Sequence, residues 1–123
     1  MAHAIIRADD VEPHDVAEWG HVGMPGTFRP VGEYLGVSAF GINQLELPPD
    51  SAAPEHDHAE DGQEEVYIVI RGRGRVRVDG TEQEIRPGTY VFLPPEARRQ
   101  MVSGADGLVW VGIGCRPGAY QPP

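Results

Sequence analysis

Short apolar runs separated by turn residues dominate the chain from position 34 to position 113. Residues 75–78 alternate strictly between Arg and Val, which is the period-two pattern of a half-buried strand. Asp79-Gly80 follows, the pair favoured in a type I′ hairpin turn because both central residues take positive φ. We therefore predict a hairpin that returns through Thr81–Ile85. Further strands are expected at 34–47, 66–70, Tyr90–Leu93, 98–102 and 108–113, with a loop at 103–107.

Helical periodicity is weak everywhere. The segment 9–19 comes nearest, but Pro13 interrupts it, so we expect at most one short helical turn there. The Gly- and Pro-rich segment 19–31 is typical of a loop or an edge strand. Short strands at this spacing predict an all-β sandwich or barrel in one domain. We expect an irregular or edge-strand segment at 1–33, the barrel at 34–115 and a tail at 116–123.

Composition narrows the function classes. The chain of 123 residues has 19 acidic and 10 basic residues and a net charge of −9, so a nucleic-acid partner is not expected. No apolar run reaches the roughly 18 residues of a membrane span, and the N-terminus does not resemble a signal peptide. Cys115 is the sole cysteine, which excludes an intramolecular disulfide. These features predict a cytoplasmic protein without a membrane partner.

The candidate chemistry lies in one stretch before the run at 66–70. His56 and His58 are two residues apart, so on an extended chain both imidazoles point to the same face and can reach one ion. Glu65 opens the next strand and can bring a carboxylate to the same place. Two histidines and one carboxylate suit a divalent transition metal such as Fe, Mn, Ni, Zn or Cu with open coordination positions. The acidic neighbours of these histidines fit a solvated loop equally well.

The same stretch resembles the first motif of the cupin superfamily, and the sequence that follows resembles the second. The matching residues are His56, His58, Glu65 and Gly72, then Asp79-Gly80, Pro87-Gly88, Tyr90–Leu93 and Pro94. The likeness covers residues 45–113. It implies a double-stranded β-helix, also called a jelly-roll barrel, with an internal pocket in which the metal of the family usually lies.

Two departures from that pattern bear on the site. The six residues between His58 and Glu65 make a longer gap than is usual in the family, so Glu64 is a rival ligand. We prefer Glu65 because its six-residue step to Gly72 fits the motif. The resemblance also implies a fourth, histidine ligand after Pro94, and Arg99 holds that place. A guanidinium has no lone pair to offer and cannot bind a metal ion.

Three interpretations of Arg99 follow. The histidines and Glu65 still bind a metal, or Arg99 replaces the metal and pairs with Glu65 across the pocket, or Arg99 points to solvent. A guanidinium inside the pocket would favour an anionic ligand such as a carboxylate. If Glu65 points inward, strand alternation places Tyr67 and Val69 on the same face. These two, with Phe92, Arg99 and Trp110, are expected to line the pocket or fill the core.

The function we predict is a small cupin that binds a small, in particular anionic, molecule in its barrel, without an assignable reaction. One alternative is a mononuclear metal-dependent enzyme of the dioxygenase type. Another is a metal-free isomerase or epimerase, in which His56 or His58 would act as a base. The resemblance to cupins further implies a homodimer.

Overall fold

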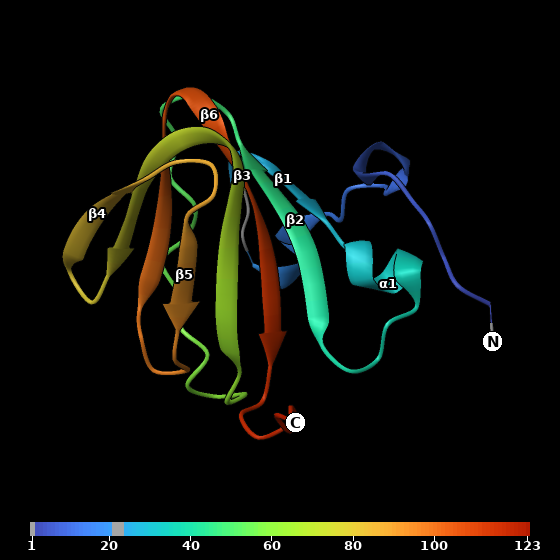
Figure 1. The fold of residues 1–123 in the computed structure, drawn as a ribbon. Coiled ribbons are helices and arrows are strands. Elements are labelled where there is room, and N and C mark those ends of the chain that lie inside the picture. Colours follow the sequence, from blue (N-terminus) through green and yellow to red (C-terminus); the bar gives the residue numbers. More distant parts are fainter. Residues whose placement is uncertain (1, 21–23) are drawn as a thin grey trace.

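The computed structural model describes residues 2–20 and 24–123, and its architecture is almost entirely β (Figure 1). The strands are β1 (Thr27–Arg29), β2 (Gly41–Leu47), β3 (Glu64–Val78), β4 (Thr81–Ile85), β5 (Tyr90–Leu93) and β6 (Arg99–Cys115). The short helices are η1 (Ala8–Asp10), η2 (Val16–Trp19) and α1 (Val31–Leu35). All strand pairs are antiparallel, in the order β1-β2-β6-β3-β4 with β5 on β3. The predicted all-β class is confirmed.

Two layers arise because the long strands β3 and β6 bend together and pair twice. One stretch joins residues 64–72 to 108–115, and the other joins residues 74–78 to 99–103. The register shifts between Gly72 and Gly74, where the bend lies. A Cβ atom on Gly74 would collide with the Val102 carbonyl, so only glycine allows this close approach. Figure 1 shows both ribbons curving over at the same end, which produces the jelly-roll barrel.

The segment between β2 and β3 runs along the start of β6 and completes the second layer. Its backbone forms isolated bridges from Ala52 to Val102 and from His56 to Arg99. The His56 amide donates to the Arg99 carbonyl at 3.0 Å, and the Arg99 amide donates back at 2.9 Å. Residues that oppose one another in this way project to the same face of a sheet. The backbone therefore places the His56 and Arg99 side chains on one wall of the barrel.

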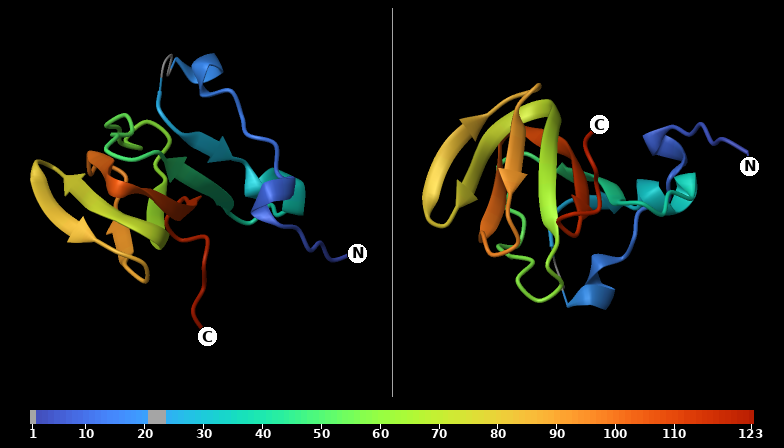
Figure 2. Two further views of the ribbon diagram at one scale, coloured as in Figure 1. Left: turned by 90° about the horizontal axis from the view of Figure 1, so that it is seen from above. Right: turned by 60° about the horizontal axis from the view of Figure 1, so that its bottom comes forward.

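The barrel interior is closed by a cluster of apolar side chains. The buried members are Leu47, Ala53, Tyr67, Val69, Val76, Ile85, Leu93, Met101, Leu108 and Trp110. They come from both layers, which means that the two sheets share one core. Figures 1 and 2 place α1 and the N-terminal segment beside β1 and β2, at the side of the barrel away from β4.

Local sequence rules predicted several elements correctly. β4 and β5 have the predicted bounds, and the turn between β3 and β4 has φ of 49° at Asp79 and 82° at Gly80. The β3 arginines beside this turn lie toward solvent, where Arg77 Nε is 2.7 Å from Glu82 Oε1. The alternation of valine and arginine therefore did mark a core face and a solvent face.

Three predicted boundaries were wrong. The strands expected at 66–70 and 75–78 are parts of one strand, β3. The segment 34–47 is not one strand, because α1 continues to Leu35 and ends at Gly36, which takes the left-handed conformation with φ of 75°. The expected loop at 103–107 is part of β6, which runs unbroken through the bend. Ser103 is buried there, and its hydroxyl donates to the Pro48 carbonyl at 2.6 Å. Turn-forming residues at this position bend the strand instead of ending it.

The N-terminal third contains more regular structure than expected. Two 3₁₀ turns, η1 and η2, flank Pro13 where one turn was predicted. Of the segment 19–31, residues 21–23 lie outside the described residues, and β1 pairs with β2 as an edge strand. Within the part of the chain that the structure describes, no helix has the length and apolarity needed to cross a membrane.

Candidate functional site

A cavity of about 540 Å³ opens inside the barrel between the two layers. Six of the predicted site residues line it: His56, His58, Glu65, Tyr67, Arg99 and Trp110. The other wall residues are mostly apolar and include Phe28, Leu45 and Met101. The cavity therefore has one polar side, built around His56, His58 and Glu65, and a larger apolar wall.

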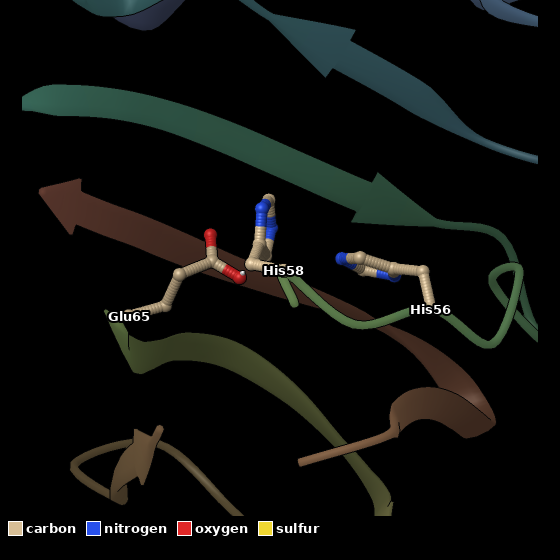
Figure 3. A group of neighbouring side chains, drawn as sticks. All are labelled: His56, His58 and Glu65. Atoms are coloured by element: carbon tan, nitrogen blue, oxygen red, sulfur yellow. Dashed lines mark ion pairs between the residues drawn. The ribbon is translucent and has the colours of Figure 1, made fainter. Parts of the chain in front are cut away.

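The two histidines and Glu65 form a compact cluster (Figure 3). One potential ligand atom from each lies within 4.8 Å of the other two. His56 and His58 come from the segment before β3, and their rings meet edge to face with centroids 5.3 Å apart. Glu65 comes from the start of β3. The predicted convergence of these three side chains occurs, and the group can hold a metal ion.

Each histidine is held at its Nδ1 atom by an oxygen. His56 Nδ1 donates to the Pro54 carbonyl at 3.3 Å, and His58 Nδ1 lies 3.0 Å from Oδ1 of Asp61. Because the Pro54 carbonyl can only accept, His56 carries its ring proton on Nδ1 and keeps a lone pair on Nε2. Both ring nitrogens of His58 face carboxylates, Asp61 at Nδ1 and Glu65 at Nε2. This outer layer of acceptors is typical of metal-binding histidines, whose tautomer and orientation it fixes. The donor set and its supports therefore fit a divalent ion.

One carboxylate oxygen of Glu65 contacts three other side chains on the polar side of the cavity. Oε1 of Glu65 lies 3.2 Å from His58 Nε2 and 3.2 Å from Arg99 Nη2. It also accepts a hydrogen bond from the Tyr67 hydroxyl at 3.2 Å. The same oxygen is thus placed both to bind a metal with the histidines and to neutralise Arg99.

Arg99 is fully buried, and its guanidinium is only partly satisfied. Nη1 donates to the Ala97 carbonyl at 2.7 Å. Nη2 forms the ion pair with Glu65, but its alignment falls outside hydrogen-bond geometry. Among the described residues, neither Nε nor Nη2 has a hydrogen-bond acceptor, and Nε1 of Trp110 has none either. Buried donors of this kind are costly, because each forgoes its hydrogen bonds to water.

Burial shifts two of the titratable groups that line the cavity. It lowers the pKa of His56 below its usual value, although the hydrogen bond to Pro54 and the charge of Glu65 oppose the shift. Burial, followed by the nearby Glu65 charge, raises the pKa of Tyr67 far above its usual value. At neutral pH, His56 is therefore uncharged and has a free lone pair, and Tyr67 remains a hydrogen-bond donor.

Several predicted side chains lie elsewhere, and the reasons are geometric. Phe92 does not line the cavity: its partner across β3 is Val66, and it is 61% exposed on the outer face. Val69 faces inward but packs in the apolar core. Glu64 is absent from the cluster because strand alternation turns it away from the face that Glu65 occupies. The interpretation in which Arg99 points to solvent is wrong, because its exposure is 0%.

The supports of the histidines were not predicted from the sequence. Asp61 is one of the acidic neighbours that fit a solvated loop equally well, yet its carboxylate contacts His58. Its position three residues after His58 was the available signal. Pro54 acts through its backbone carbonyl, which no side-chain pattern can indicate.

The comparisons with known proteins agree with this architecture. The family model described as the Cupin domain matches residues 43–111, so the chain belongs to the cupin family. A curated dimethylsulfoniopropionate lyase, DddW of Ruegeria pomeroyi, is 32% identical over 74 residues, covering 60% of this chain and 42% of that protein. A glucose-6-phosphate isomerase of Pyrococcus horikoshii is 34% identical over 64 residues, covering 47% of this chain and 34% of that protein.

The chain thus matches less than half the length of both curated relatives. Among solved structures, one described as a sugar phosphate isomerase of the cupin superfamily, from Silicibacter pomeroyi, superposes with a TM-score of 0.74. The identity is 23%, and the match covers 92% of this chain and 76% of that one. At this identity the likeness shows the fold alone, which is the jelly-roll barrel described above.

Proposed function

We propose that the protein binds a small anionic molecule in its barrel and that a carboxylate of that molecule contacts Arg99. The observation that carries this proposal is the state of Arg99. A guanidinium with 0% exposure lines the cavity, and its Nε and Nη2 atoms lack hydrogen-bond acceptors among the described residues. These two atoms form the side-on fork with which arginine binds a carboxylate through two parallel hydrogen bonds.

The apolar wall of the cavity supports a particular kind of carboxylate. Phe28, Leu45 and Trp110 lie on that wall, and such side chains favour contact with hydrocarbon. Nε1 of Trp110 is a further donor that a hydroxyl, carbonyl or ether oxygen of the ligand can satisfy. A monocarboxylate with an apolar body and one additional oxygen would match all three features.

A calorimetric titration tests the proposal with pairs of ligands that differ only in charge. Benzoate and butyrate serve as carboxylates, and benzamide and butyramide serve as neutral controls of similar shape. We expect the carboxylates to bind the wild type and to bind Arg99→Met at least about tenfold more weakly, the equivalent of one charge-assisted hydrogen bond. Equal binding of carboxylates and amides, or full affinity in Arg99→Met, would overturn the proposal.

The matched control is Arg98→Met. Arg98 is the neighbouring residue, but it lies outside the cavity, where it pairs with Glu55 and Asp57 at 3.0 Å and 3.1 Å. Removing it takes away the same charge and leaves the cavity intact. Carboxylate binding in this variant should equal that of the wild type.

A second candidate function is metal-dependent catalysis, favoured by the oxygens that hold Nδ1 of His56 and His58. A bound divalent ion would supply a Lewis acid with open coordination positions. His56, His58 and Glu65 would hold it, and Tyr67 would orient Glu65. The two curated relatives are named as a lyase and an isomerase, so a metal-dependent reaction and a metal-free isomerisation with a histidine base are both open to test.

Elemental analysis of the purified protein tests the metal. Near-stoichiometric Fe, Mn, Ni, Zn or Cu in the wild type, lost in the His56→Ala/His58→Ala double variant, is the expected result. His3→Ala is the control, since His3 is exposed and outside the cluster. Metal retained by the double variant would exclude this site.

We further propose that the protein is a homodimer, joined through the outer face of β5, β3 and β6. Phe92 and Tyr90 are 61% and 71% exposed on this face. They flank Val66 and Ile68 in register, and β6 continues the apolar surface on the other side of β3. A contiguous apolar sheet face of this kind is typical of a protein–protein interface.

A further inference from the structure

We propose that a divalent metal ion and the carboxylate ligand bind to this cavity with positive coupling, and that Glu65 and Arg99 provide the coupling. The inference rests on the proposed function. It joins two of the interpretations of Arg99, metal binding and pairing with Glu65, as two states of the same site. In one state Glu65 neutralises Arg99. In the other, Glu65 belongs to the ion, and the ligand's carboxylate takes its place on Arg99.

One oxygen of Glu65 lies between the metal-binding histidine pair and Arg99. Oε1 of Glu65 is equidistant, at 3.2 Å, from Nε2 of His58 and from Nη2 of Arg99. Nε2 is the His58 ring atom on the Glu65 side, because Nδ1 is turned toward Asp61. The Glu65 carboxylate can therefore bind a metal ion and is, among the described residues, the only ion-pair partner of Arg99.

The charges of the site favour joint binding of the ion and the anion. Without an ion, Glu65 and Arg99 cancel, and an added carboxylate would bring an uncompensated negative charge beside Glu65. With a divalent ion, the ion, Glu65 and Arg99 together carry two positive charges, of which the Asp61 carboxylate beside His58 offsets one. Charges in a poorly hydrated cavity interact strongly, so this excess weakens ion binding until an anion enters. Each partner thus removes the electrostatic cost that opposes the other.

Access of a ligand to the Arg99 guanidinium depends on the Glu65 carboxylate. Nε and Nη2 of Arg99 are buried, and the Glu65 carboxylate lies against Nη2. Glu65 itself keeps 16% of its side chain exposed at the cavity. When this carboxylate shifts toward the histidines, Nε and Nη2 of Arg99 become accessible from the cavity. The ligand's carboxylate can then form the bidentate contact that Glu65 does not form, since its alignment with Nη2 is outside hydrogen-bond geometry.

Each of two coupled ligands raises the affinity of the other by the same factor. The coupling can therefore be measured by titrating either the ion or the carboxylate. The test is a calorimetric titration of Mn²⁺ into wild-type protein, alone and with saturating benzoate or butyrate. The matching amides are the neutral controls. We expect each carboxylate to tighten Mn²⁺ binding by at least about fivefold, the lower end of typical couplings between sites. The amides should have no effect.

Two variants separate the coupling from simple metal chemistry. In Arg99→Met the carboxylate has no partner, so Mn²⁺ binding should be the same with and without benzoate. This variant also controls for complexes of Mn²⁺ with benzoate in solution. In Arg99→His the side chain becomes a metal donor, so Mn²⁺ should bind more tightly than in the wild type and without help from the carboxylate. Arg98→Met should retain the wild-type coupling.

The outcomes distinguish this inference from the proposed function. Carboxylates that bind the wild type but leave the Mn²⁺ affinity unchanged would overturn the coupling and leave the anion site standing. A wild-type protein that binds no Mn²⁺ under any of these conditions would also overturn it. If neither carboxylate binds with or without Mn²⁺, the proposed function fails as well. A shared increase in wild type and Arg99→Met would assign the effect to solution chemistry and remove the role of Arg99.

Discussion

The carboxylate of Asp61 lies 3.0 Å from Nδ1 of His58, at the ring nitrogen that does not face Glu65. The second carboxylate oxygen lies 3.1 Å from the same atom. Burial raises the pKa of Asp61, but hydrogen bonds from His58 and Gln63 outweigh it, and the net pKa is lowered. Asp61 is therefore ionised at neutral pH, and its carboxylate fixes the orientation of the His58 ring.

This relationship predicts a positioning role for Asp61. In Asp61→Asn, we expect Mn²⁺ affinity to fall by about tenfold to a hundredfold, the usual cost of removing a partner of a metal-binding histidine. The fold should remain, because Asp61 is partly exposed. Calorimetry gives the affinity, and circular dichroism checks the fold. Asp57→Asn is the control, since Asp57 pairs with Arg98 outside the cavity. Unchanged affinity in Asp61→Asn would contradict the role.

A second prediction concerns the stability supplied by Arg99. Replacing it by Met leaves the largely buried Glu65 carboxylate without its arginine partner, which we expect to lower the free energy of unfolding by about 3 kcal/mol. Arg98→Met removes an exposed charge and should cost less than about 1 kcal/mol. Urea unfolding at neutral pH measures both values.

The double variant Arg99→Met/Glu65→Gln completes this comparison. The introduced glutamine side chain would carry no charge, so the double variant should regain part of the stability lost in Arg99→Met. Such non-additivity is the signature of a direct interaction between two residues. If the two substitutions were simply additive, Arg99 would stabilise the fold by packing alone and the ion pair would contribute nothing.

The sequence predicted the elements that short-range rules control. The turn at Asp79-Gly80 and the bounds of β4 and β5 follow from residues within a few positions of one another. The stretch 103–107 follows a different rule, because glycine permits both a turn and a bend. Which of the two forms depends on the pairing of β6 with β3, a contact between distant segments. Local composition contains no information about that contact.

Side-chain facing separated the correct site predictions from the wrong ones. Glu65 and Tyr67 are on one strand, so alternation alone relates them. Phe92 and Leu93 differ by one residue, and the register of β5 on β3 decides which of them faces inward. It pairs Leu93 with Glu65, so Leu93 is buried and Phe92 is not. The facing of Arg99 likewise depends on its bridge to His56. Only the resemblance to the second cupin motif pointed to this facing, and it left the solvent-facing alternative open.

A third prediction follows from the pair Arg29–Glu46, which joins β1 to β2 at 2.8 Å. Burial opposes ionisation of Glu46, but the hydrogen bond from Arg29 and further contacts outweigh it, so its pKa is lowered below its usual value. A carboxylate with a depressed pKa in the folded state stabilises the fold above its unfolded pKa. That stability is lost as the pH falls through the folded pKa.

The stabilisation should therefore be present at neutral pH and absent in strong acid. We expect Glu46→Gln to be less stable than the wild type by about 1 kcal/mol at neutral pH and equally stable below the folded pKa. Urea unfolding as a function of pH measures the difference. Glu84→Gln on β4 is an exposed control that should show no such loss. A difference that persists unchanged in acid would show that Glu46 acts through packing.

The last prediction concerns the outer sheet face and the proposed homodimer. Phe92→Glu places a charge at the centre of the apolar surface shared with Val66 and Tyr90. Burying that charge in an interface would be costly, so the variant should be monomeric. Light scattering after size exclusion should give twice the 13.4 kDa chain mass for the wild type and a single chain mass for Phe92→Glu.

Because Phe92 lies outside the cavity, carboxylate binding should persist in the variant. Ile5→Glu is the control, since Ile5 is exposed but lies in the N-terminal segment. A monomeric wild type would refute the dimer, and a dimeric Phe92→Glu would assign the interface to another face.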